Sequence, residues 1–115
     1  MFEVRRTERF IQWLDGLSDA RAVAKIAARA ERLAWGNFGD VQPVGEGVSE
    51  LRIHYGPGYR VYFGLDGMML VVLLLCGDKR TQEEDIAFAK VLWTEYRARK
   101  PASSSSPGKP RRNRF

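Results

Sequence analysis

Strand-like segments separated by turn residues constrain the fold of this chain more than any other feature. Residues 50–55 alternate between polar and apolar, which is the period of a half-buried strand. Gly56-Pro57-Gly58 predicts a turn, and residues 59–63 predict the returning strand. Asp66-Gly67 then predicts a second tight hairpin, and residues 68–75 are apolar on both faces. We therefore expect three antiparallel strands, the last of them central in a sheet.

Two helices are predicted before these strands. Residues 2–5 alternate and predict a short opening strand. A first helix is predicted over residues 7–16 with Thr7 as its N-cap, and a second over residues 18–37 with Ser18 as the candidate N-cap. Apolar residues recur at helical spacing in both segments. We expect the two helices to form a hairpin that packs on the sheet.

Residues 36–47 contain four glycines and a proline and are predicted to form a loop. Further along the chain, residues 81–84 fit the capping-box pattern and begin a helix that ends near Arg97. The predicted order is a strand, two helices, three antiparallel strands and a helix. This order indicates the α/β (α+β) fold class.

Positive charge is concentrated at the C-terminal end of the chain. The 115 residues carry a formal net charge of +5, but residues 1–96 hold 12 basic and 14 acidic residues, a net charge of −2. The other seven basic residues lie from Arg97 onward, where serine and proline are frequent. We expect one folded domain over residues 1–97 and a basic, disordered tail over residues 98–115. Such a tail either attracts nucleic acid or only keeps the protein soluble.

Residue counts argue against several kinds of site. One histidine and one cysteine exclude an internal disulfide framework and provide no recognisable metal-ligand spacing. Cys76 ends an apolar run, so we expect it to be a buried packing residue. That run, Met68 to Cys76, has nine residues, whereas a transmembrane helix needs about 20. We expect a soluble cytoplasmic protein without metal, cofactor or membrane contact.

A cationic face is predicted on the first hairpin. Arg52 and His54 alternate with apolar residues on one strand, and Arg60 and Tyr62 do so on the next. If the apolar residues face the helices, these four side chains share the opposite, solvent-exposed face. Cations beside an aromatic ring suit a phosphodiester backbone with a stacked base. An outward-facing arginine such as Arg60 is more often a solvated cross-strand partner, for example of Glu50, than a phosphate ligand.

Other basic residues have similar alternatives. Lys79 and Arg80 follow the last predicted strand, where they either extend the cationic face or form a loop charge pair. The second predicted helix has a basic flank, which is most simply a solvated face, although an acidic protein partner could bind it. This flank consists of Arg21, Lys25, Arg29 and Arg32.

Three stretches of the sequence match a known family. They are Gly36–Asp40 followed by Pro43–Gly45, Glu50–Arg52 with Gly56–Phe63, and Gly77–Lys79 with Thr81-Gln82. Together with the order of elements, they resemble the RelE/ParE superfamily of toxins from type II toxin–antitoxin modules. Within this superfamily, the chain is most similar to the HigB-like "addiction module killer protein" branch. The resemblance covers about residues 2–97.

The resemblance implies a RelE-like antiparallel sheet with an N-terminal helical hairpin on one face and a C-terminal helix. It implies a cognate antitoxin, usually a small DNA-binding protein, as partner. The activity it implies is cleavage of mRNA on the ribosome, in which the 2′-hydroxyl attacks the adjacent phosphate and no metal is needed. The protein then has to position the strand, assist proton transfer and stabilise charge at phosphorus.

The resemblance also implies roles for single residues. Arg60 matches a phosphate-contacting arginine, and Lys79 with Arg80 matches the basic cluster after the last strand. The loop at this point has one glycine where the family has two, so either Lys79 or Arg80 could reach the phosphate. His54 is the expected general acid or base, because an imidazole exchanges protons near neutral pH. The expected catalytic residues are His54, Arg60 and Lys79, and the expected RNA-binding residues are Arg52, Tyr62 and Arg80.

A second class of function stays open. ParE-like relatives are toxins without enzymatic activity that bind DNA gyrase. They tend to lack the basic set found here, and its presence favours the nuclease. A third possibility is an inactive remnant that acts as a binding module.

Overall fold

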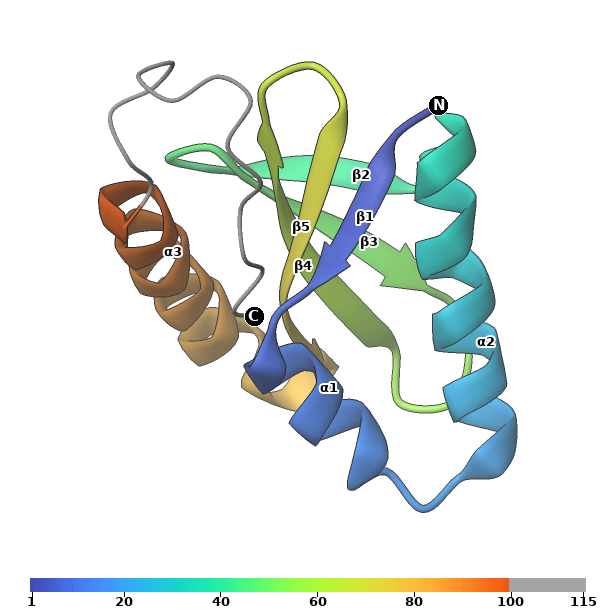
Figure 1. Ribbon diagram of the computed structural model, residues 1–115. Coiled ribbons are helices and arrows are strands. Elements are labelled where there is room, and N and C mark those ends of the chain that lie inside the picture. The colour runs from blue at the N-terminus through green and yellow to red at the C-terminus, as the bar shows by residue number, and fades with distance from the viewer. Residues whose placement is uncertain (100–115) are drawn as a thin grey trace.

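A five-stranded sheet forms the centre of the structure, a computed structural model that describes residues 1–99 (Figure 1). The strand order is β1-β5-β4-β3-β2. The strands are β1 (Glu3–Arg6), β2 (Val41–Gly45), β3 (Val48–Ile53), β4 (Tyr59–Asp66) and β5 (Leu70–Asp78). The helices are α1 (Glu8–Asp15), α2 (Ala20–Arg32) and α3 (Gln82–Arg99), with short 3-10 helices at Leu33–Trp35 and Lys79–Thr81.

The two predicted hairpins are present, and β5 lies in the sheet between β1 and β4. The expectation of an antiparallel sheet is wrong at one edge, because β1 pairs with β5 in parallel, with Glu3 beside Leu70. The sheet is therefore mixed. In the sequence, the α1–α2 hairpin connects β1 to the remaining strands, and this long connection allows β1 to run parallel to β5.

The predicted loop over residues 36–47 is also corrected, because part of it forms β2. This strand pairs antiparallel with β3, and the register shifts between Pro43 and Gly45. The position of β2 at the edge of the sheet explains the proline, which has no N–H for a second neighbouring strand. Glycines and a proline obscured the strand pattern in the sequence.

The helical hairpin packs on one face of the sheet, as predicted (Figure 1). Phe10 of α1 and Ile26 of α2 are buried against Val61 and Phe63 of β4. The hydroxyl of Thr7 caps α1 by accepting a hydrogen bond from the backbone N–H of Phe10. Asp19, rather than Ser18, caps α2 by accepting from two backbone N–H groups.

Helix α3 covers the opposite face of the sheet, so that face is not open to solvent (Figure 1). Trp93 and Tyr96 stack with ring centroids 5.3 Å apart and pack on the sheet. Gly64 of β4 permits this approach, because a Cβ at that position would lie 2.7 Å from the Trp93 ring. The hydroxyl of Thr81 donates to Asp85 rather than capping the helix.

Helix α3 continues to Arg99, two residues beyond the predicted end of the domain at Arg97. The rest of the predicted tail, residues 100–115, lies outside the described residues. Among residues 1–99, no helix combines the length and the hydrophobicity needed to cross a bilayer.

Candidate nucleic-acid interface

A shallow hollow lies where β3 ends and β4 begins, beside the start of the 3-10 helix after β5. We call it the hairpin hollow. Four of the predicted site residues line it, namely Arg52, His54, Arg60 and Lys79. The structure therefore brings together all three expected catalytic residues and one expected RNA-binding residue.

Strand register explains this convergence. Arg52 and Arg60 are direct cross-strand partners on β3 and β4. Tyr59 at the start of β4 pairs with Asp78 at the end of β5, so Lys79 follows at the same end of the sheet. Gly58, with a φ of 83°, turns the chain between β3 and β4 next to Arg60 and Lys79.

A buried carboxylate organises the two arginines. Glu50 is 1% exposed and accepts hydrogen bonds from the side chains of Arg52 (3.0 Å), Tyr62 (3.2 Å) and Gln82 (2.8 Å). Its Oε2 also lies 3.5 Å from Nε of Arg60, as an ion pair without hydrogen-bond geometry. A buried carboxylate with this many partners is held in a single position. Glu50 thereby fixes the stems of both arginines.

Arg60 is thus a cross-strand partner of Glu50, one of the two alternatives. Its side chain is only 11% exposed, because α3 covers this face of the sheet. Nη1 of Arg60 donates to the carbonyl of Gly58 at 3.0 Å. Nη2 makes no hydrogen bond within residues 1–99. The guanidinium is therefore anchored on one side and keeps N–H donors for a ligand on the other.

His54 contacts a carboxylate that the sequence analysis did not identify. Its Nε2 lies 2.6 Å from Oδ2 of Asp40, in the segment before β2. The carbonyl of Asp40 also accepts the backbone N–H of Arg52 at 2.9 Å, which ties this segment to β3. The His54 side chain is 75% exposed and open to a ligand. A carboxylate on one ring nitrogen fixes the orientation of an imidazole.

Tyr62 does not lie on an open face, and that expectation is wrong. It is fully buried beneath α3, where its hydroxyl donates to Glu50. Burial, together with the Glu50 charge, raises the pKa of Tyr62 well above its usual range. The Tyr62 ring is not accessible for stacking on a base, because α3 covers it. The local sequence pattern shows strand alternation but does not show which helix packs on which face.

Lys79 and Arg80 have different surroundings. Lys79 lines the hairpin hollow, whereas Arg80 does not. Arg80 points to solvent and donates to Asp78 through Nη2 at 3.0 Å. The hydrogen bond from Arg80 is the main reason why the pKa of Asp78 lies below its usual range. Of the two alternatives for a phosphate contact, the geometry favours Lys79.

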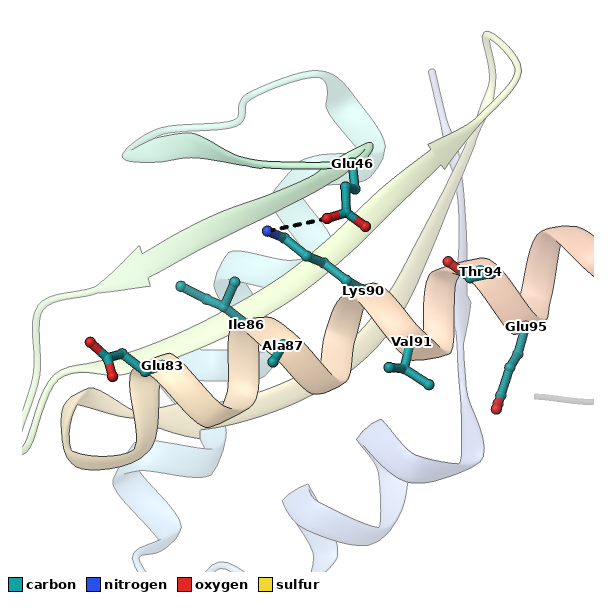
Figure 2. Close-up of a pocket in the computed structure, with 8 residues that line it drawn as sticks. All are labelled: Glu46, Glu83, Ile86, Ala87, Lys90, Val91, Thr94 and Glu95. Carbon is teal, nitrogen blue, oxygen red and sulfur yellow. Dashed lines mark ion pairs between the residues drawn. The ribbon is translucent and has the colours of Figure 1, made fainter.

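Other parts of the described structure offer no comparable chemistry. Cys76 is buried as expected, and burial raises the pKa of its thiol. Residues 1–99 contain no cluster of three or more side chains placed to hold a metal ion. A second hollow lies between α3 and the β2–β3 turn, where Lys90 pairs with Glu46 at 3.8 Å (Figure 2). Glu83 and Glu95 also line it, and this excess of carboxylates disfavours phosphate.

The chain matches no protein-family model. It is 50% identical over 93 residues to a protein of Haemophilus influenzae (strain ATCC 51907 / DSM 11121 / KW20 / Rd) that is described as an uncharacterized protein. The chain belongs to the family of this Haemophilus protein. The alignment covers 81% of this chain and 94% of the relative, so the two proteins correspond over most of both sequences.

Proposed function

We propose that this protein is the toxin of a type II toxin–antitoxin pair of the RelE/ParE superfamily and cleaves mRNA on the ribosome in the cytoplasm. The observation that carries the proposal is the convergence of Arg52, His54, Arg60 and Lys79 on the hairpin hollow. Three of these four residues are basic, and the fourth is a histidine that contacts a carboxylate. This combination suits cleavage of a phosphodiester by an adjacent hydroxyl.

In the proposed reaction, the 2′-hydroxyl oxygen bonds to the adjacent phosphorus and the bond from phosphorus to the 5′-oxygen breaks. The 2′-hydroxyl loses a proton, and the leaving oxygen gains one. His54, oriented by Asp40, serves one of these two proton transfers. Arg60 and Lys79 stabilise the negative charge that builds up on the phosphate oxygens.

The anchoring of Arg60 supports this role. A cation held in place before the substrate arrives loses little freedom when charge develops, and this makes electrostatic stabilisation effective. Glu50 and the carbonyl of Gly58 provide that anchoring. Arg52 then contributes to strand binding beside the reacting phosphate.

The proposal is tested by adding the purified protein to a translation extract and mapping the 5′ ends of the mRNA. We expect new 5′ ends only while translation runs, and none in a parallel sample in which initiation is blocked. Lys79→Gln and Arg60→Lys should each lower cleavage by about 100-fold, because each removes a positioned donor. Lys90→Gln, which removes a cation from the hollow beside α3, is the matched control and should cleave normally.

Full cleavage by both hollow variants would overturn the assignment of the site. A parallel supercoiling assay with DNA gyrase tests the ParE-like alternative directly. Inhibition of gyrase without any cleavage of mRNA would replace the nuclease proposal. The proposed partner is a cognate antitoxin, and a short neighbouring reading frame for a helix-turn-helix protein would support it.

A further inference from the structure

A second cationic surface lies on α2, next to the hairpin hollow. Four basic residues recur along one face of this helix and line a shallow depression, namely Arg21, Lys25, Arg29 and Arg32. Ala24 and Ala28 lie between them and leave the depression open, because their side chains are small. The four cations span about 17 Å along the helix axis at 1.5 Å per residue. We call this surface the α2 track.

The charges of the α2 track are not neutralised. None of its four basic side chains forms an ion pair with a carboxylate within residues 1–99. Lys25 lies over the Tyr55 ring at 5.3 Å, and Nη1 of Arg29 donates to the carbonyl of Arg52 at 3.4 Å. Of the acidic residues nearby, Asp19 caps α2, Asp40 contacts His54, and Glu31 of α2 forms no ion pair with the four basic residues. The track is a concentration of positive charge without an internal partner.

The α2 track and the hairpin hollow are continuous. Ile53, His54 and Tyr55 line both depressions, because the chain leaves β3 and passes along α2 before it turns into β4 (Figure 1). Arg29 connects the two surfaces through its hydrogen bond to the backbone of Arg52. A row of phosphates bound along α2 would therefore contact basic side chains continuously as far as His54.

We propose that the α2 track binds the phosphodiester backbone of RNA and guides the strand into the hairpin hollow. This inference rests on the proposed function, because it takes the hollow as the point of cleavage. Cationic side chains along a groove provide RNA affinity that is independent of sequence. An acidic protein segment fits the track less well, since protein interfaces draw most of their affinity from buried apolar anchors. On α2 the residues between the cations are alanines. Of the other apolar residues that line the depression, Ile53 is buried and the Tyr55 ring lies beneath Lys25.

The test measures binding of a fluorescent, single-stranded 12-nucleotide RNA to the full chain by anisotropy, without ribosomes, across a range of KCl concentrations. The test variant combines Arg21→Gln, Lys25→Gln and Arg32→Gln, all at exposed positions of the track. Its affinity should fall by about 10-fold or more at 0.1 M salt. The slope of log affinity against log salt should become shallower by about 2, since each phosphate contact contributes about 0.7 for a single strand.

The matched control removes the same charge elsewhere and combines Arg6→Gln, Arg9→Gln and Lys90→Gln. None of these residues lines the track or the hollow. The control should bind with an affinity within about 3-fold of the wild type. Thermal unfolding of both triple variants checks that each is folded.

A second arm measures co-sedimentation with empty 30S subunits. If the track variant loses binding only to the oligonucleotide, the ligand of the track is the mRNA strand. If it also loses binding to 30S subunits, the track binds ribosomal RNA as well. Each result supports the proposal. Equal RNA affinity of the two triple variants overturns it. Binding of a polyglutamate peptide, but not of RNA, to the wild type overturns it in favour of an acidic protein partner.

The two proposals can fail separately. Arg60→Lys should lose cleavage and keep its affinity for the 12-nucleotide RNA within about 3-fold, because the track is intact. If the track variants bind normally while Arg60→Lys loses cleavage, the inference about α2 is wrong and the proposed function stands. If the track variants lose binding while Arg60→Lys cleaves fully, the hollow is not the point of cleavage and both proposals fail.

Discussion

Arg52 and Arg60 lie directly opposite one another on β3 and β4, and both guanidinium groups reach the buried carboxylate of Glu50. Two like charges at a cross-strand pair repel each other unless an anion separates them. Glu50 is that anion, and Tyr62 and Gln82 complete its hydrogen bonds. The positions of Arg52 and Arg60 in the hairpin hollow therefore depend on a buried residue that does not line it.

Replacement of Glu50 should destabilise the protein strongly. Glu50→Gln leaves two arginines facing each other without their counter-ion, and removal of one partner from a buried ion network costs about 3–5 kcal/mol. Urea unfolding followed by circular dichroism measures this change. Glu3→Gln removes an exposed carboxylate 4.0 Å from Arg5 and should alter the free energy of unfolding by less than about 0.5 kcal/mol. A similar decrease in the free energy of unfolding of Glu50→Gln and Glu3→Gln would show that the buried ion pairs of Glu50 contribute no more to stability than an exposed one.

The contact between Asp40 and His54 predicts a positioning role. Asp40→Asn keeps the size of the side chain but removes the charge that orients the imidazole, so the rate of mRNA cleavage should fall by about 10- to 1000-fold. The measurement is cleavage in the translation extract under single-turnover conditions, with RNA affinity recorded in parallel. RNA affinity should stay within about 3-fold of the wild type. Asp15→Asn, at the end of α1, is the control.

An equal rate in Asp40→Asn and in the wild type would exclude Asp40 from the reaction. A fall in RNA affinity that matches the fall in rate would show that Asp40 organises strand binding rather than proton transfer.

The depressed pKa of Asp78 predicts a pH-dependent contribution to stability. The hydrogen bond from Arg80 favours the charged carboxylate in the folded state, so the contribution is present above the pKa of an unfolded aspartate, about 3.9. It is lost as the pH falls through the lower pKa of the folded state. Asp78→Ala should therefore lower the free energy of unfolding by about 1–2 kcal/mol at pH 7.

Unfolding of the wild type and of Asp78→Ala should be compared between pH 2 and pH 7. The difference between the two proteins should narrow below about pH 4, while the other carboxylates titrate equally in both. A difference that is constant down to pH 2 would mean that Asp78 acts only through packing.

Removal of residues 101–115 should leave cleavage largely unchanged. The charged residues that line the hairpin hollow lie between positions 52 and 79, and those of the α2 track between positions 21 and 32. The expected result is growth inhibition and mRNA cleavage within about 3-fold of the full chain, since charge at the site rather than net charge provides the binding. Loss of activity on truncation would assign a binding role to the tail.

Several parts of the fold and the site follow from local patterns alone. A period of two, interrupted by turn residues, predicts both hairpins, because alternation and turn geometry involve residues that are close in the chain. The same register places Arg52 opposite Arg60 and brings Lys79 to the same end of the sheet. Thr7 as an N-cap and Cys76 as a buried residue are predicted for the same reason.

The tertiary structure decided which faces of the sheet are covered and which distant segments meet. Packing of α3 buried Tyr62 and covered most of Arg60, because the apolar side of α3 packs on the sheet face that the first two helices leave free. The parallel pairing of β1, the contact of Asp40 with His54 and the position of α2 beside the hollow depend on residues far apart in the sequence. Local propensity carries no information about such pairs, since their free energy arises only when the two surfaces pack together. The sequence by itself thus determined the hairpins and the cations they carry, whereas packing decided which of those cations line the hairpin hollow.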